Sequence, residues 1–230
     1  MDRLEFLKKM KTAVLAAGLL MMSTSCAFSG NSGNTVLNGD LKFTQADLSV
    51  KPFMEIEIET VADVYYTQTN GDQQDVRLDF SKISDPKFKK QLMENVKVVY
   101  RENKMIIGLA SRVKGISKLK NNERLRVYVT SPDLVKVSLE GVGSFNANAI
   151  NSDVFEIDNE GVGNVNVKNL LANKIEITNE GVGNVRIDNM QSDHVDIDNE
   201  GVGNVQIALF KGGHLDIDNE GVGKVDAHVD

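Results

Sequence analysis

Apolar and polar residues alternate along most of the chain beyond residue 50. In "HVDIDNEGVGNVQIALF", for example, Val195 and Ile197 precede two glycines, and Val205 and Ile207 follow them. Alternation with period two is typical of β-strands, because successive side chains of a strand point to opposite faces. The same pattern predicts six earlier strands, at Met54–Glu59, Ala62–Gln68, Asp75–Phe80, Val96–Arg101, Lys104–Leu109 and Arg124–Thr130. One short amphipathic segment, Asp85–Val96, predicts a helix.

From residue 134 onward this alternation recurs at a constant interval. Each repeat is marked by the tetrapeptide Glu-Gly-Val-Gly, which starts at Glu140, Glu160, Glu180, Glu200 and Glu220. Such self-similarity is the signature of a repeat architecture. The glycines of the five copies are predicted to form structural corners, at Gly141, Gly143, Gly161, Gly163, Gly181, Gly183, Gly201, Gly203, Gly221 and Gly223.

Two arrangements of the repeat are compatible with strands. If the glycines turned hairpins, the units would form an antiparallel meander; if the chain kept winding in one sense, each unit would be one coil of a β-solenoid. The valine between the glycines favours the solenoid, because hairpin tips normally carry polar residues. We therefore expect these five valines to point inward at the corners, namely Val142, Val162, Val182, Val202 and Val222.

Stacking the units at a shift of one repeat produces continuous apolar columns, which supports the solenoid. One column contains asparagine at Asn159, Asn179, Asn199 and Asn219 but leucine at Leu139, so we expect it to face inward with its amides bonded to one another. The fold class predicted is all-β: a right-handed, single-stranded parallel β-helix with about five regular coils at its C-terminal end, each one repeat long, and less regular β-rich coils before them.

The pattern divides the chain into four parts. Residues 1–26 are predicted to be a lipoprotein signal peptide, residues 27–39 a flexible tether, residues 40–133 an irregular β-rich part, and residues 134–230 the regular solenoid. The irregular part either caps the solenoid or forms its early coils. A basic loop in this part, Ser111–Arg124, is interpreted as solvated surface.

The N-terminal segment has the layout of a secretory signal. Three lysines, Lys8, Lys9 and Lys11, precede an apolar stretch, and small residues lead to Cys26, the single cysteine of the chain. This arrangement resembles a bacterial lipobox, although Ser23 stands where leucine is commonest. The alternative is an ordinary signal peptide with an incidental cysteine. We expect a protein that is exported to the cell envelope and lipid-anchored at Cys26, in the outer membrane.

Composition excludes several classes of function. The chain has a net charge of −7, and nucleic acid is excluded as a partner because phosphate binding requires a basic surface. The Gly-x-Gly sequences are not followed by a helical pattern, so they are not nucleotide-binding loops. The sequence contains no recognisable nucleophile–base arrangement, and no cofactor is expected apart from a divalent cation.

Alternation places twelve carboxylates on the outer face of the strand that precedes each corner. Three interpretations are open: a solvated acidic face, a ladder of sites for Ca²⁺, and a carbohydrate-active enzyme with an acid and a base. Carboxylate oxygens are the ligands that Ca²⁺ prefers. The residues of this predicted calcium ladder are Glu160, Glu180, Asp198, Glu200 and Glu220. Near-identical repetition favours architecture over catalysis, because glycosidases need two carboxylates in different environments.

Three segments of the chain resemble a known family: "DLSVKPFMEIEIETVADVYYTQTNGDQQDVRLDF", "VKVVYRENKMIIGL" and "LRVYVTSPDLVKVSLEGVGSF". They are similar to the domain called putative auto-transporter adhesin, head GIN domain, which occurs in exported lipoproteins. The resemblance covers nearly the whole chain after the signal peptide. It implies a β-helical fold at the cell envelope and an adhesive role, and it carries no catalytic motif.

We therefore expect a non-enzymatic envelope lipoprotein with a β-helical structural, adhesive or ligand-binding module. Its expected partners are the membrane, through the lipid anchor, and a glycan, lipid or envelope protein ligand. A carbohydrate-active β-helix enzyme and a cation-stabilised binding surface are the alternatives.

Overall fold

The computed structural model describes residues 36–37, 40–41, 50–111, 113 and 123–230. The chain divides into two units, residues 1–35 and 36–230. The predicted signal peptide, its lipidation site at Cys26 and most of the basic loop lie outside the described residues, as does most of the predicted tether.

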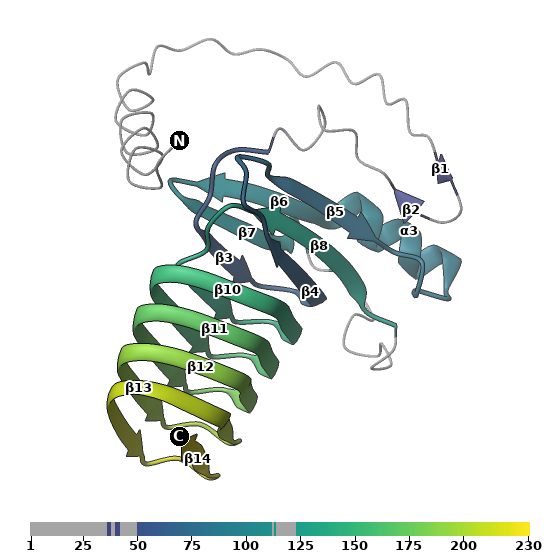
Figure 1. Ribbon diagram of the computed structural model, residues 1–230. Coiled ribbons are helices and arrows are strands. Elements are labelled where there is room, and N and C mark those ends of the chain that lie inside the picture. The colour runs from purple at the N-terminus through teal and green to yellow at the C-terminus, as the bar shows by residue number, and fades with distance from the viewer. Residues whose placement is uncertain (1–35, 38–39, 42–49, 112, 114–122) are drawn as a thin grey trace. The chain divides into compact units, whose positions relative to one another are not determined.

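The described chain is nearly all β and contains a β-solenoid of about five turns over residues 136–229 (Figure 1). The predicted fold class is therefore confirmed. The one helix among the described residues is too short and too polar to span a membrane. The elements are β1 (Val36–Leu37), β2 (Asp40–Leu41), β3 (Glu55–Ile58), β4 (Val61–Gln68), β5 (Asp75–Asp79), α3 (Pro86–Asn95), β6 (Val96–Arg101), β7 (Lys104–Leu109), β8 (Leu125–Ser131), β9 (Lys136–Leu139), β10 (Val142–Asn159), β11 (Val162–Asn179), β12 (Val182–Asn199), β13 (Val205–Asn219) and β14 (Val225–Val229).

The bounds predicted for these elements from local sequence patterns are confirmed closely. Each of the six early strands is present within one or two residues of its predicted bounds. The helix α3 starts at Pro86 because Asp85 caps it: the carboxylate accepts a hydrogen bond from the backbone N–H of Phe88 at 2.8 Å, and proline suits the first helical turn.

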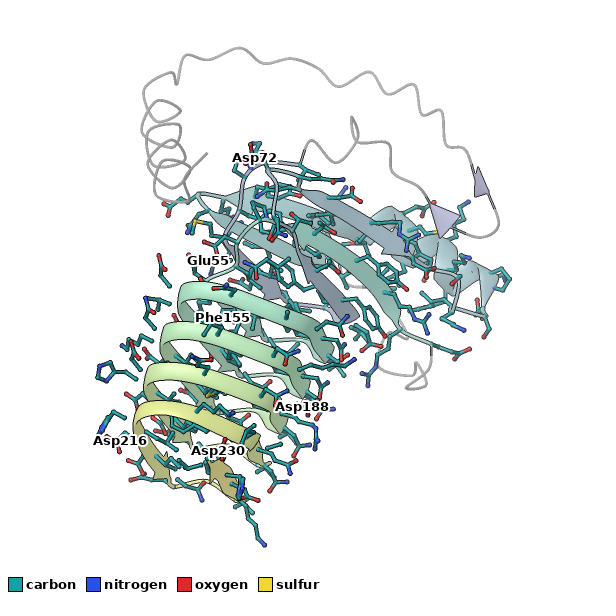
Figure 2. The ribbon with its side chains drawn as sticks, viewed as in Figure 1. Glu55, Asp72, Phe155, Asp188, Asp216 and Asp230 are labelled. Atoms are coloured by element: carbon teal, nitrogen blue, oxygen red, sulfur yellow. The ribbon has the colours of Figure 1, made fainter. Side chains whose placement is uncertain are left out.

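The regular coils stack in parallel with a shift of one repeat. Phe145 of β10 pairs with Val165 of β11, and the same shift continues through Val185 of β12 to Val205 of β13. The buried apolar columns of these strands form one continuous core, and Phe155 lies within it (Figure 2). Side chains become more exposed in β13 and β14, because β14 pairs with a described strand on one side only.

The irregular part supplies both early coils and a closed end. In the sheet β3 lies between β7 and β9, and β4 lies between β8 and β10. The strands β3 and β4 are thus inserted between strands that follow them in sequence. The antiparallel strands β5 and β6 then close this end by pairing with β8 and β7.

A degenerate corner is present in the inserted coil. Val142 pairs with Val61 and Gly143 pairs with Ala62, so the tetrapeptide Glu59-Thr60-Val61-Ala62 occupies the place of Glu-Gly-Val-Gly. The structural repeat therefore begins at this tetrapeptide, long before the first recognisable copy of the sequence repeat.

The predicted orientation of the corner valines is wrong. Val162, Val182 and Val202 are 51%, 51% and 50% exposed, and the valines of the other two copies are exposed as well. The valines point outward because the in–out alternation of the flanking strands continues through the corner: Asn179 and Gly181 face inward, whereas Glu180 and Val182 face outward.

The glycines are required by close stacking of backbone on backbone. A Cβ built at Gly183 would lie far inside van der Waals contact with the carbonyl oxygen of Gly163, and the equivalent clash recurs at every corner glycine of the repeat. The ten predicted corner glycines therefore do lie at the corners. They are needed because the backbones of successive coils are too close for a Cβ, whereas the sequence argument for the solenoid rested on the valine between them.

The asparagine column faces inward, as predicted. Asn159, Asn179 and Asn199 are fully buried. The Nδ2 of each donates to the Oδ1 of the asparagine in the next coil, at distances of 2.6, 2.5 and 2.6 Å, with Asn219 as the last acceptor. Oδ1 of Asn159 has no hydrogen-bond partner among the described residues, because the preceding position is Leu139.

Substitution of a corner glycine is expected to destabilise the solenoid much more than substitution of its neighbouring valine. Gly183→Ala forces a Cβ against the Gly163 carbonyl and should lower the free energy of unfolding by a few kcal/mol. The matched control Val182→Thr, on an exposed side chain of similar shape, should stay within about 0.5 kcal/mol of wild type. Urea unfolding followed by circular dichroism measures both; equal effects of the two substitutions would contradict the outward orientation of the valines.

Candidate ligand-binding groove

One outward-facing row of side chains crosses the strands that follow the corners. Strand register places its members side by side on eight neighbouring strands, and we call this set the register row. It consists of Arg77, Tyr128, Tyr65, Asn146, Asn166, Arg186, Gln206 and Asp226. The row results from two rules acting together: alternation sends every second side chain outward, and parallel stacking aligns equivalent positions of successive coils.

Two tyrosines form an aromatic pair at one end of the row. The rings of Tyr65 and Tyr128 stack with centroids 5.3 Å apart and an interplanar angle of 21°. The guanidinium carbon of Arg77 lies 4.4 Å from the centroid of the Tyr128 ring, a cation–π contact that holds this ring in place. Both tyrosines are partly exposed, so part of their surface is open to a ligand.

The neighbouring tyrosine, Tyr66, has a different role. It is 2% exposed and its hydroxyl lies 3.0 Å from Oγ of Ser131. In the sequence "ADVYYTQ" the two adjacent tyrosines thus face opposite sides of β4. One belongs to the core, and the other belongs to the register row.

Amide side chains continue the row beyond the tyrosines. Nδ2 of Asn166 donates to Oδ1 of Asn146 at 3.1 Å, and Nδ2 of Asn146 donates to Oγ of Ser144 at 2.8 Å. Farther along, Arg186 donates from Nη1 to Oε1 of Gln206 at 2.7 Å and from Nε to Asp188 at 3.0 Å. These contacts order the polar side chains before any ligand arrives.

A groove of about 430 Å³ follows this part of the row. We call it the tyrosine–amide groove. It crosses β8, β4, β10, β11 and β12, and its lining residues are Tyr65, Tyr66, Thr67, Tyr128, Asn146, Ala147, Asn148, Asn166, Val167, Lys168, Arg186 and Asp188. Asp188 lies on the side of the coils opposite Asp216, which belongs to the acidic face (Figure 2). Such a concave surface with an aromatic part and converging polar groups is typical of binding sites.

The residues of the predicted calcium ladder lie on that acidic face. Glu160, Glu180, Glu200 and Glu220 are exposed at successive corners, and Asp198 is half-buried. Among the described residues, one group of three carboxylates has its ligand atoms within 4.8 Å of one another, and it contains none of these five. The calcium ladder stays a prediction.

That group consists of Glu57, Glu59 and Glu140, at the junction of the irregular and regular coils. Burial opposes ionisation of Glu57, but the hydrogen bond from Lys104 and the nearby positive charges outweigh it and lower the pKa of Glu57. Burial and the adjacent Glu57 carboxylate raise the pKa of Glu59. Burial, together with the charges of Glu57 and Glu160, raises the pKa of Glu140.

Sequence reasoning missed both the tyrosine–amide groove and this carboxylate group. The groove joins residues from β8, β4 and β10 that are far apart in the chain, and periodicity does not pair them. A faint signal existed for the carboxylate group, since Glu59 and Glu140 occupy equivalent places in the degenerate and the first regular corner.

Fold and groove together define a β-solenoid with a solvent-accessible groove on its side. The chain belongs to the family putative auto-transporter adhesin, head GIN domain, whose family model matches residues 52–230. Members of this adhesin-like family are not described as enzymes, and membership indicates an exported or surface protein. The family expected from the sequence is thereby confirmed. No curated protein matches the chain.

Several solved structures resemble the chain. A putative adhesin from Bacteroides fragilis has a TM-score of 0.54 and 21% identity, over 78% of this chain and 94% of the other, which shows a shared fold. A putative adhesin from Parabacteroides merdae has a TM-score of 0.43 and 16% identity, over 78% and 93% of the two chains. A protein from Parabacteroides distasonis, described as a putative lipid binding protein, has a TM-score of 0.42 and 12% identity, over 76% and 93%.

Glu59→Gln is expected to stabilise the protein at neutral pH and to have little effect in acid. The raised pKa of Glu59 means that its contribution to stability is full at low pH and is lost as the pH rises through the folded-state pKa. Glutamine mimics the protonated carboxyl at every pH. Melting temperatures of wild type and variant should therefore differ at pH 7 and converge below pH 4.

Asp72→Asn, in an exposed turn between β4 and β5, is the control for loss of a surface charge. A Glu59→Gln variant that melts no higher than wild type at pH 7, or no higher than the Asp72→Asn control, would contradict the repulsion between Glu57 and Glu59.

Proposed function

We propose that this protein is a non-enzymatic adhesive module of the cell envelope that binds its ligand in the tyrosine–amide groove. The observation that carries the proposal is the register row, in which stacked tyrosines and hydrogen-bonded amides are already ordered on a rigid sheet. A preorganised surface loses little conformational freedom on binding. Membership of an adhesin-like family supports the same function.

The chemistry of the groove favours binding over catalysis. Asp188 is the one carboxylate among the described residues that line the groove, and it accepts a hydrogen bond from Arg186 at 3.0 Å. Glycoside hydrolysis commonly requires two carboxylates that flank the scissile bond. The carboxylates that do cluster, at Glu57, Glu59 and Glu140, belong to a corner and do not line the groove.

We further propose that a lipid on Cys26 holds the module at the outer membrane. The basic start, apolar stretch and small residues before Cys26 support this proposal. A tether over residues 27–39 would let the module reach ligands away from the membrane surface.

Cys26→Ala is expected to release the protein from the membrane fraction. Wild type and variant are expressed in full length in a bacterium with lipoprotein export, and membrane and soluble fractions are compared by immunoblot. The substitution removes the only thiol of the chain, so an acyl group can no longer be attached there. Membrane association equal to that of wild type would contradict lipidation at this residue.

The binding role is tested on an array of immobilised glycans, phospholipids and envelope proteins. The full chain carrying Cys26→Ala should bind at least one class, and Tyr65→Ser with Tyr128→Ser should abolish that binding. The control Asp216→Asn changes the acidic face and should bind like the parent. If the tyrosine variant, confirmed as folded by circular dichroism, binds every spot as the parent does, the groove is not the contact surface.

A further inference from the structure

The register row has the geometry of a site for a polymer. It crosses the strands, so its members repeat at the strand spacing of about 4.8 Å, and seven such steps from Arg77 to Asp226 extend over roughly 34 Å. This direction follows the stacking of the coils. A ligand lying along the row would therefore meet a side chain at each regular step. Such regular spacing suits a polymer, whose similar units also follow one another at regular intervals.

The charges near the row are largely matched within the protein. Arg186 binds Asp188 and Gln206. Asp63 accepts hydrogen bonds from Arg124 at 3.3 Å and from Ser144 at 2.9 Å. Among the described residues that line the groove, Lys168 is one further cation beside the Arg186–Asp188 pair. A single lysine is not the concentrated positive charge that an acidic polymer needs, and the net charge of −7 repels such a polymer further.

The groups that remain suit the hydroxyls and ring faces of sugars. An amide side chain has two N–H donors and a carbonyl acceptor, so Asn146 and Asn166 can bind a neighbouring hydroxyl in addition to each other. An aromatic ring has a negative face that attracts the weakly positive C–H face of a pyranose. The Tyr128 ring is stacked between Tyr65 and Arg77, so the ring face that can receive a sugar at the closed end of the row is the one that Tyr65 turns away from Tyr128.

We propose that the ligand of the tyrosine–amide groove is an uncharged linear glycan that lies along the register row. This inference rests on the proposed binding function and specifies its ligand class. One sugar ring packs on Tyr65, whose ring is held by Tyr128, and the following units meet Asn146, Asn166 and the Arg186–Asp188 pair in turn. Arg77 is a positioning residue, because it contacts the Tyr128 ring and does not line the groove.

Calorimetry with defined oligosaccharides tests the inference. The full chain carrying Cys26→Ala is titrated with linear manno-, xylo- and gluco-oligosaccharides of increasing length, and with polygalacturonate as the acidic comparison. At least one neutral series should bind, with an affinity that rises with length and then levels off when the row is filled. Binding should depend little on salt.

Variants separate stacking from hydrogen bonding. Tyr65→Ser with Tyr128→Ser should weaken binding about tenfold or more, which corresponds to roughly 1.4 kcal/mol. Tyr65→Phe with Tyr128→Phe keeps the rings and should retain most of the affinity, and it also guards against a fold defect in the serine variant. Asn166→Ala should reduce the affinity for long oligosaccharides more than the affinity for short ones. The control Asp216→Asn should leave both affinities unchanged.

The possible contrary results are distinct. Stronger, salt-sensitive binding of polygalacturonate, or affinity that is independent of length, would overturn the neutral linear glycan. Groove-dependent binding of a lipid or a protein on the array, without binding of any neutral oligosaccharide, would overturn this inference and leave the proposed function standing. If the Tyr65→Ser, Tyr128→Ser variant bound like the parent both on the array and in calorimetry, the proposed binding function of the groove and the glycan inference would both be overturned.

Discussion

The close contact between backbones at each corner is the constraint on which the rest of the structure depends. The N–H groups of Glu180 and Gly181 both donate to the carbonyl oxygen of Asn159, at 3.0 and 2.7 Å, and the next corner repeats this pattern on Asn179. A side chain on the glycine would push the coils apart. Because two donors converge on one acceptor at the four corners that begin at Glu140, Glu160, Glu180 and Glu200, the coils cannot slip relative to one another without losing these bonds.

The fixed register has consequences on both faces of the sheet. Inside, it aligns asparagines so that each amide donates to the next, which satisfies polar groups that would be costly to bury alone. Outside, the same register aligns Asn146 with Asn166 and Tyr65 with Tyr128. One residue type therefore serves the core in one column and the solvent-facing groove in another, and alternation along the strand decides which.

The two outer faces differ in charge for the same reason. On the strand before each corner, outward positions carry carboxylates that repeat from coil to coil, with Lys136 bound to Glu156 at 2.5 Å at the first regular coil. On the strand after the corner, outward positions carry amides, tyrosines and paired charges. The molecule thus separates an acidic face from a face of amides, tyrosines and paired charges, although both are built from one repeated unit.

Much of this architecture is encoded locally and is readable in the sequence. Period-two alternation located the strands, the constant interval between Glu-Gly-Val-Gly copies gave the stacking shift, and Leu139 in the asparagine column revealed that this column faces inward. The orientation of Val182 was misjudged because an apolar side chain at a corner was expected to be buried, whereas the alternation continues through the corner and places this valine on the outer face. The place of β3 and β4 between later coils, and hence the meeting of Tyr65 with Tyr128 and Asn146, follows from pairing between distant segments. Such pairing depends on which strand edges fit together in three dimensions, and no local pattern records it.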